Sequence, residues 1–259
     1  MDIVVCIKRV PLIQEVDLEI NDAQTGVRDE ALAYVINDWD NYAVEEAVIL
    51  KEQLGGSVTA ITVGSEADEE VLRRALAMGA DQALRIDPGS RQLDGFVISR
   101  ILAKAIGTMT YDLILTGVQA DDDNGGMVGS MVAEGLGIGH AAVITAINIK
   151  DGEAVVHTEL EGGMDEVSKV KLPALLSIQT GINEPRYVSI MGIRKARKKE
   201  LKVTDLESLG LSEDDLTPRT VVEQVFFPPE TAGAEMIQGD AGAVAETLLN
   251  LLKEKGVGK

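Results

Sequence analysis

One polar segment has the residue types and spacing that bind phosphate groups: GVQADDDNGGMVG, residues 117–129. It follows the apolar run 112–117 and leads, through a pair of glycines, into a stretch with helical periodicity. In α/β proteins this is the carboxyl end of a strand, where free N–H groups and the positive end of a helix dipole face a bound anion. The three consecutive aspartates are also compatible with a divalent cation or with a solvated loop. We expect a phosphate site here, with those two alternatives open.

Two further segments are expected to reach the same edge of the sheet. Residues 37–40, NDWD, open a stretch with clear helical periodicity, and Val63 lies at the end of the apolar run 57–64. Because the carboxyl ends of parallel strands meet at one edge, these segments and residues 117–129 would converge on one crevice. Trp39, the only tryptophan, is by itself more typical of packing than of ring stacking. Three converging loops favour a nucleotide as the ligand.

Residues that could catalyse a reaction are sparse. His140 and His157 both fall inside predicted strands, without the spacing to a cysteine or another histidine that a metal site needs. Cys6 lies in an apolar strand and is more typical of a small buried hydrophobe than of a nucleophile. The chain also lacks GxSxG, a Walker A motif, and GxGxxG between a strand and a helix. We therefore predict neither a catalytic residue nor a metal site.

Short apolar runs alternate with helical periodicity up to residue 150, which predicts βαβ units on a mostly parallel, twisted sheet with flanking helices. The predicted strands are 3–7, 57–64, 82–87, 112–117 and 140–150, and the predicted helices are 38–56, a stretch from residue 65, one around 96–105 and 125–137. Ser65 and Asp68 resemble a capping box. The chain after the first strand does not lead directly into a helix, and we expect an irregular excursion with a turn at 22–26.

Three runs beyond residue 150 alternate like antiparallel strands joined by DG and GG turns, so we expect a meander at the sheet edge. These runs are 151–160, 166–171 and 173–179. From Glu184 the chain is polar and rich in turns, and residues 240–255 form an amphipathic stretch whose apolar face needs a docking surface. The prediction is a nucleotide-binding α/β domain at 1–183 and an extended C-terminal arm at 184–259 that packs on a partner chain.

The charge balance excludes several classes of partner. Forty-three acidic residues against 24 basic ones give a net charge of −19, which repels nucleic acid and anionic lipid surfaces. No apolar run approaches the roughly 18 residues of a membrane span. The start MDIVVCIKRV has no basic, cleavable leader, and a single cysteine cannot form an intrachain disulfide. We therefore expect a cytoplasmic protein that neither binds nucleic acid nor lies embedded in a membrane.

Several motifs together resemble the β subunit of electron transfer flavoproteins (ETF) over nearly the whole chain. They are VVCIKRV at the start, NxxDxxAVEEAVxLKE at 37–52, ALAMGAD at 75–81, GVQADDD at 117–123, NEPRY at 183–187 and RKARKKELK at 194–202. The family's signature at 155–177 is present with departures, since Thr158 stands where a basic residue is usual and Ser168 where an aliphatic one is usual. The resemblance implies a Rossmann-like α/β fold of the adenine-nucleotide α-hydrolase type.

The resemblance also implies an electron carrier without substrate-converting chemistry of its own. Such a β subunit forms an obligate heterodimer with an α subunit that carries the redox-active FAD, accepts electrons from dehydrogenases such as acyl-CoA dehydrogenase, and serves an acceptor like ETF-quinone oxidoreductase. It buries a structural AMP or, in electron-bifurcating members that oxidise NADH, a second FAD. Val118 before Gln119 and the loop DDDNGGMVGS depart from the bifurcating pattern, which favours AMP. The loop also differs from the NQT pattern of AMP-binding members, so FAD stays the alternative.

The resemblance assigns nucleotide ligands by position. They are Cys6, Asn37, Asp38, Trp39, Asp40, Val63, Gly117, Val118, Gln119, Ala120, Asp121, Asp122, Asp123, Asn124, Gly125, Gly126, Met127 and Val128. Backbone groups near Cys6 and Val63 would face the adenine, and residues 37–40 the adenine or the ribose. Residues 124–128 would face the phosphate at the helix N-terminus.

The NEPRY motif resembles the recognition loop that anchors partner dehydrogenases. The implied contacts are Glu184, Pro185, Arg186, Tyr187 and Ile190. Ile190 takes the place of the loop's protruding aliphatic residue, and one apolar anchor among polar neighbours suits fast exchange of partners. The basic run 194–199 fits a solvated helix face, guidance toward an acidic partner surface or the steadying of reduced flavin. By analogy Ile13 approaches the α-subunit flavin. A homodimeric nucleotide sensor is a third interpretation, against which the arm and NEPRY argue.

Overall fold

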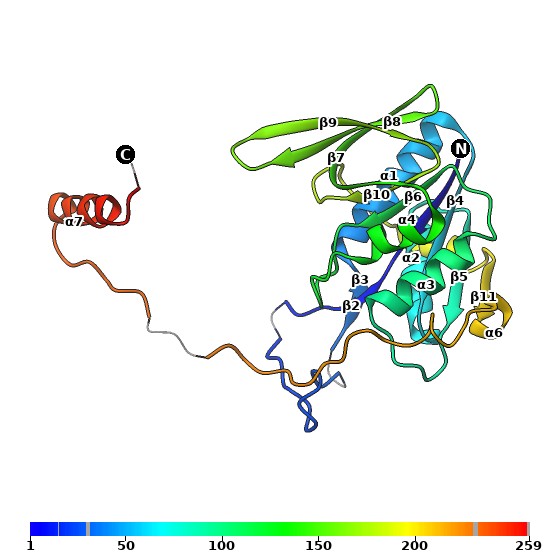
Figure 1. Ribbon diagram of the computed structural model, residues 1–259, viewed down its shortest axis with the longest axis horizontal. Helices are drawn as coiled ribbons and strands as arrows, with labels where there is room; N and C mark the ends of the chain where they lie inside the picture. The colour runs from blue at the N-terminus through cyan, green and yellow to red at the C-terminus, as the bar shows by residue number, and fades with distance from the viewer. Residues whose placement is uncertain (15, 30–31, 230–232, 258–259) are drawn as a thin grey trace.

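The computed structural model describes residues 1–14, 16–29, 32–229 and 233–257. In this part of the chain the predicted alternation builds a nine-stranded sheet, in the order β11-β5-β4-β1-β6-β10-β7-β8-β9 (Figure 1). Its strands are β1 (Asp2–Cys6), β4 (Ser57–Val63), β5 (Gln82–Asp87), β6 (Leu113–Gly117), β7 (Gly139–Lys150), β8 (Glu153–Leu160), β9 (Met164–Lys171), β10 (Ala174–Ile178) and β11 (Leu201–Asp205). In this described sheet β8 runs opposite to the other strands, and it pairs antiparallel with β7 and β9. The predicted α/β class is confirmed.

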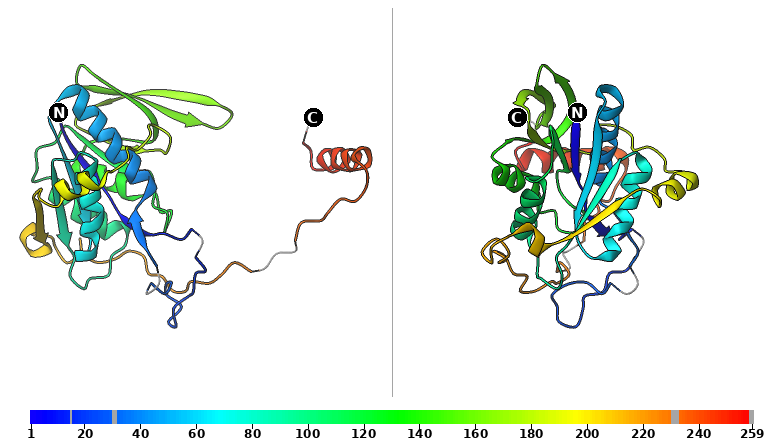
Figure 2. Two further views of the ribbon diagram at one scale, coloured as in Figure 1. Left: turned by 180° about the vertical axis from the view of Figure 1, so that it is seen from behind. Right: turned by 90° about the vertical axis from the view of Figure 1, so that its right-hand side faces the viewer.

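Helices cover both faces of the sheet, as Figure 2 shows. Ile3 and Val5 point to one face and pack with α1 (Asp38–Leu54) and α2 (Glu69–Met78). Val4 and Cys6 point to the other face and pack with helices α3 (Gly95–Ile106) and α4 (Val128–Leu136). Side chains of a strand alternate between faces, so a strand buried on both sides is apolar throughout. The core therefore has two layers, one on each side of the sheet.

Strand β10 corrects one prediction. The run 173–179 is not the edge of a meander: β10 lies between β6 and β7, runs parallel to both, and is buried along its whole length. Its sequence ALLSI is nearly continuous in apolar residues, which is typical of a strand covered on both faces rather than of an edge strand. The other two runs do form the antiparallel edge, as β8 and β9, and their hairpin extends beyond the body in Figure 1.

A second prediction is wrong in detail. Ser65 does not cap a backbone N–H; its hydroxyl donates to the carboxylate of Asp68 at 2.8 Å. The 3₁₀ turn η1 (Glu66–Asp68) precedes the helix, which begins only at Glu69. The pair therefore stabilises the turn that leads into α2 rather than the helix end itself.

The excursion after β1 is confirmed. It begins and ends in a small antiparallel sheet of β2 (Arg9–Pro11) and β3 (Tyr34–Ile36). Within it, Asn21 and Gly26 close a turn through a backbone hydrogen bond of 2.9 Å. Strand β3 of the small sheet ends at Ile36, directly before the N-terminus of α1.

The C-terminal segment returns to the body before it becomes an arm. Helix α5 (Ile190–Ala196) packs on α2, and β11 extends the sheet beside β5, followed by α6 (Leu206–Leu209). The extended arm therefore starts later than residue 184. It ends in α7 (Ala241–Glu254), which has no buried residue within the described part of the chain and lies apart from the body in Figure 2. No helix among the described residues is long and apolar enough to cross a membrane.

Candidate functional site

A cavity of about 540 Å³ opens at the carboxyl ends of the central parallel strands. Residues of β1, β4 and β6 line it, together with the first turns of α3 and α4 and the segment that connects β6 to α4. The predicted convergence of three loops is therefore observed. Ligand sites in open α/β sheets lie at this edge because helix N-termini and strand ends leave backbone groups without partners there.

Most residues predicted for the site do line the cavity. They are Cys6, Asn37, Asp40, Val63, Gly117, Val118, Gln119, Ala120, Asp123, Gly125, Gly126, Met127 and Val128. Five predicted residues are not among the lining residues: Asp38, Trp39, Asp121, Asp122 and Asn124. Trp39 instead donates its indole N–H to Gln179 at 2.8 Å, which fits the packing role expected from sequence.

The N-terminus of α1 holds the site's longest loop in shape. The buried Asn37 donates from Nδ2 to the carbonyl of Gln119 at 2.8 Å and accepts from the amide of Asp121 at 3.1 Å. The buried Asp40 accepts from the amide of Lys8 at 2.7 Å and from that of Gly117 at 2.9 Å. Both side chains are thus engaged by backbone groups, those of Gln119 and Asp121 in the loop and those of Lys8 and Gly117 near the ends of β1 and β6. These contacts hold the loop in position at the cavity.

Burial sets the ionisation of two groups at the cavity floor. It raises the pKa of Asp40 to about 7, against the opposing effect of the hydrogen bonds that its carboxylate accepts. Burial likewise raises the pKa of the Cys6 thiol far above its usual value, and the nearby Asp40 adds to the shift. A protonated, buried thiol is a poor nucleophile, which agrees with the absence of a catalytic role predicted for Cys6.

Two glycines let neighbouring elements of the structure approach each other closely around the loop. A Cβ on Gly129 would lie 2.7 Å from Ser177 Oγ and 2.9 Å from Thr116 Oγ1, so glycine lets the first turn of α4 rest directly on the sheet. A Cβ on Gly117 would lie 2.6 Å from the Cβ of Trp39. Glycine there lets the end of β6 meet the start of α1. Any larger residue at either position would have to move the loop or the helix.

The acidic run of the loop faces a lysine. Lys8 Nζ lies 2.6 Å from Asp122 Oδ1 and 3.0 Å from Asp123 Oδ2. Asp123 also accepts from the amide of Gly125 at 2.8 Å. Burial raises the pKa of Asp123, but these contacts outweigh it and hold the pKa below its usual value. Among the described residues no three His, Cys, Asp or Glu side chains converge as a metal site would require.

Sequence reasoning missed part of the cavity wall. The missed lining residues include Ile7, Lys8, Ile61, Thr62, Gln92, Leu93, Asp94, Gly95, Ile98, Leu102, Thr116, Gly129, Thr220 and Val222. Lys8 and the segment 92–95 follow the ends of β1 and β5, so the same strand-end argument could have found them. No local pattern points to Thr220 and Val222, which come from the start of the arm.

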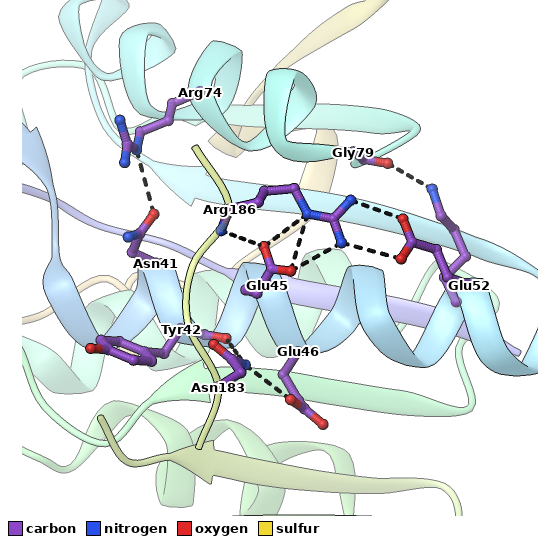
Figure 3. Close-up of polar contacts among 10 residues, drawn as sticks. Asn41, Tyr42, Glu45, Glu46, Glu52, Arg74, Gly79, Asn183 and Arg186 are labelled. Atoms are coloured by element: carbon purple, nitrogen blue, oxygen red, sulfur yellow. Dashed lines mark hydrogen bonds and ion pairs between the residues drawn. The ribbon is translucent and has the colours of Figure 1, made fainter. Parts of the chain in front are cut away.

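A second candidate region, the NEPRY segment, lies across the middle of α1 (Figure 3). The guanidinium of Arg186 binds Glu45, with a shortest distance of 2.9 Å, and Glu52 at 2.8 Å. Asn183 donates to Glu46 Oε2 at 2.9 Å and to the carbonyl of Tyr42 at 3.2 Å. These contacts raise the pKa of Arg186 above its usual value, chiefly through Glu52 and Glu45. The polar side chains of the motif therefore anchor the segment to its own chain.

The anchoring leaves an apolar surface facing outward. Tyr187 is 90% exposed, and Ile190 and Met191, which open the short helix α5, are 74% and 68% exposed. Glu184 is exposed as well, whereas Pro185 and Arg186 are half-buried.

The basic residues beside this surface differ in their contacts: four are exposed and one binds the body of the protein. Arg194, Lys195, Arg197 and Lys198 are exposed. Lys199 turns inward and donates to the carbonyls of Leu76 at 3.0 Å and Ala80 at 2.5 Å, at the C-terminal end of α2. Cations are favourable at the carbonyl end of a helix, so Lys199 supports the fold while its neighbours remain free for solvent or a partner.

Comparison with known proteins agrees with this architecture. The family model described as "Electron transfer flavoprotein domain" matches residues 25–209. The electron transfer flavoprotein subunit beta of Bacillus subtilis is 39% identical over 90% of this chain and 91% of its own length. The subunit beta of Methylophilus methylotrophus is 35% identical over 98% of each chain. The caffeyl-CoA reductase-Etf complex subunit CarD of Acetobacterium woodii is 36% identical over 99% of this chain and 100% of its own.

These matches cover nearly the whole chain and include the strands, the cavity loops and the NEPRY segment. They also agree with the motifs that resemble this family at 37–52 and 183–187. The chain therefore belongs to the family of electron transfer flavoprotein β subunits.

Proposed function

We propose that this chain is the β subunit of a heterodimeric electron carrier and that its cavity binds an adenine nucleotide. The observation that carries the proposal is the cavity at the carboxyl ends of β1, β4 and β6, with the N-terminus of α4 at its wall. The first amides of α4 precede its first intrahelical bond, from Met131 N to Met127 O, and so are free to bind phosphate. Lys8 is the only lysine or arginine among the described residues that line the cavity.

The other side of the cavity suits a purine. Apolar side chains from β4 and α3 form it, namely Ile61, Val63, Ile98 and Leu102. A planar ring needs such a wall, while the backbone groups at the strand ends supply hydrogen bonds to its edge. Backbone contacts depend little on side-chain identity, which accommodates the unusual loop sequence.

We propose AMP as this nucleotide, because the loop departs from the bifurcating pattern at Val118. FAD is the second candidate, and one observation favours it: CarD, a relative at 36% identity, is named as part of a caffeyl-CoA reductase-Etf complex. In that alternative the complex oxidises NADH and this subunit holds a second flavin. We expect no reaction between the bound nucleotide and this chain's own residues, because the thiol of Cys6 is protonated and buried.

The partners follow from the exposed surfaces. We propose that an α subunit carrying FAD binds the arm, whose exposed apolar side chains include Phe226, Phe227 and the leucines of α7. Tyr187 and Ile190 would contact dehydrogenases such as acyl-CoA dehydrogenase, and electrons would pass to an acceptor like ETF-quinone oxidoreductase, with the carrier in the cytoplasm. Residues 1–183 would form most of the nucleotide-binding unit, which Thr220 and Val222 complete, and the exposed surfaces of 184–259 would serve partners.

The test is to count the nucleotides. The chain is expressed together with its α subunit, the purified heterodimer is denatured, and the FAD and AMP released are quantified. One FAD and one AMP per heterodimer is the expected result. Two FAD and no AMP would favour the bifurcating alternative, and one FAD without any second nucleotide would overturn the nucleotide site.

A further inference from the structure

The start of the arm crosses the nucleotide cavity. Residues 219–225, here called the strap, follow α6 and lead into the extended arm, and Figure 1 shows this part of the chain running beneath α3. Two strap residues, Thr220 and Val222, line the cavity together with Leu93 and Gly95. The strap therefore forms a wall that comes from a part of the sequence far from the other site loops.

One carboxylate fastens the first end of the strap. Asp94 caps α3 by accepting from the amide of Val97 through Oδ1 at 2.8 Å. Its other oxygen, Oδ2, accepts from the amides of Arg219 at 2.7 Å and Thr220 at 2.9 Å, and from the Thr220 hydroxyl at 3.1 Å. Burial raises the pKa of Asp94, but these bonds outweigh it and keep the pKa below its usual value, so the carboxylate is charged at neutral pH.

Further contacts hold the strap on both sides. The Arg219 guanidinium lies over the ring of Phe96, 4.9 Å from its centroid, and binds Asp214 at 2.7 Å. At the far end the amide of Val225 donates to the carbonyl of Gln24 at 2.7 Å, in the turn of the excursion. The strap is thus tied to α3 at one end and to the excursion at the other, with Thr220 and Val222 between the two ties.

We propose that the strap is part of the nucleotide-binding site and that Asp94 is the positioning residue that holds it there. The inference rests on the proposed function, because it concerns the same cavity. A wall attached by a few polar contacts near its ends can lift, so the strap limits how fast the nucleotide leaves. The strap continues directly into the exposed Phe226 and Phe227 of the arm, and whatever holds the arm also holds this wall.

The chain offers matched variants for a test. Asp94→Asn keeps an oxygen to cap α3 but replaces the acceptor of the strap amides by an NH₂ group. Asp205→Asn makes the same change at the cap of α6, where Asp205 accepts only from Ser208. Val222→Ala shortens a cavity-lining side chain, and Val221→Ala makes the same change one residue earlier, outside the cavity lining.

The measurement is the release rate of radiolabelled AMP from the intact heterodimer during a chase with unlabelled AMP. We expect Asp94→Asn to release AMP about tenfold faster, the value for roughly one net hydrogen bond, and Val222→Ala about threefold faster through lost apolar contact. Asp205→Asn and Val221→Ala should stay within about twofold of the wild type. If the Asp94→Asn heterodimer fails to assemble, the comparison of the AMP release rates of Val222→Ala and Val221→Ala tests the proposal.

The outcomes separate the two proposals. Equal release rates for all variants of a wild-type heterodimer that does bind AMP would overturn the role of the strap alone. A wild-type heterodimer that binds no AMP would overturn the proposed nucleotide and the strap's role together.

Discussion

Helix α1 holds two segments of the chain, the loop at the cavity and the NEPRY segment, in two different ways. At its N-terminus, Asn37 and Asp40 bind backbone groups of the loop that starts at Gly117. In its middle, Glu45 and Glu46 bind the side chains of Arg186 and Asn183. The first contacts reach backbone groups only. The glutamates of the second group are buried too, but they bind mainly side chains, and Arg186 among these is partly exposed. One helix thereby fixes the position of both the cavity loop and the NEPRY segment.

The difference determines how each segment responds to its surroundings. A buried carboxylate that binds amides is sensitive to its own protonation and little affected by salt. The ion pairs of Arg186 are partly open to solvent through Arg186 itself and through Glu52, so salt screens them more strongly. The cavity loop should therefore respond to pH and the NEPRY segment to ionic strength.

The largest expected effect comes from Asp40→Asn. The amide NH₂ group would face the N–H of Lys8 or Gly117, so one buried donor loses its acceptor at a cost of about 3 kcal/mol. Hydrogen exchange of peptides covering 117–121 in the heterodimer, at pH 8, should become roughly a hundredfold faster. Asp38→Asn, a change at the exposed neighbour, is the control, and equal protection in the two variants would contradict the role of Asp40.

Arg186→Ala should have the next largest effect. It leaves Glu45, whose side chain is 5% exposed, without its cation. We expect the opening free energy of residues 183–190 to fall by about 2 kcal/mol, discounted because Arg186 itself is half-exposed. Hydrogen exchange of that segment measures it, with Arg194→Ala as the control. Unchanged protection in Arg186→Ala would show that the segment is held by other contacts.

The pH dependence of stability tests the burial of Asp40. Its pKa of about 7 lies above the ordinary 3.8, so between these values the folded state holds a proton that the unfolded state has lost. The free energy of unfolding therefore falls as pH rises through this window, by up to about 1.4 kcal/mol per pH unit, and levels off above pH 7. Urea titrations of wild type and Asp40→Asn heterodimers from pH 5.5 to 8 measure this. The decline should be steeper in the wild type, because Glu46, whose pKa burial also raises, is present in both proteins.

Ile190→Ala should have the smallest effect on structure. Ile190 is largely exposed, so its removal should change stability by less than about 0.5 kcal/mol. Electron uptake from an acyl-CoA dehydrogenase should nevertheless slow several-fold, with unchanged flavin content, because an apolar anchor is lost. Stopped-flow reduction of the heterodimer measures the rate, with Val203→Ala as a control at another exposed apolar residue. An unaltered rate would remove Ile190 from the contact surface.

The same two segments show what could be predicted from sequence. The cavity loops could be predicted from the ends of the predicted strands, because the carboxyl ends of parallel strands always lie at the same edge of their sheet. The roles of individual side chains were harder to predict. The sequence predicted Asn37 and Asp40 as nucleotide ligands, because a sequence pattern cannot show that these side chains already accept hydrogen bonds from backbone amides distant in the sequence. Nothing in the sequence indicated that Glu45 and Glu46 bind the NEPRY segment, because Arg186 and Asn183 lie 141 and 137 residues further along the chain.

Two other features could not be placed from local patterns. The apolar run of β10 is typical of a strand covered on both faces, but its place between β6 and β7 depends on a chain crossing that periodicity does not encode. Thr220 and Val222 lie in a segment without helical or strand periodicity, and contacts with residues distant in sequence, such as Asp94 and Gln24, bring them to the cavity.

The nucleotide content of two variant heterodimers tests the division of roles on α1 most directly. Asp40→Asn and Arg186→Ala are purified with the α subunit, and the AMP released on denaturation is quantified for each. We predict that Asp40→Asn retains much less AMP than the wild type, while Arg186→Ala retains as much. Full retention by Asp40→Asn together with loss from Arg186→Ala would contradict the account.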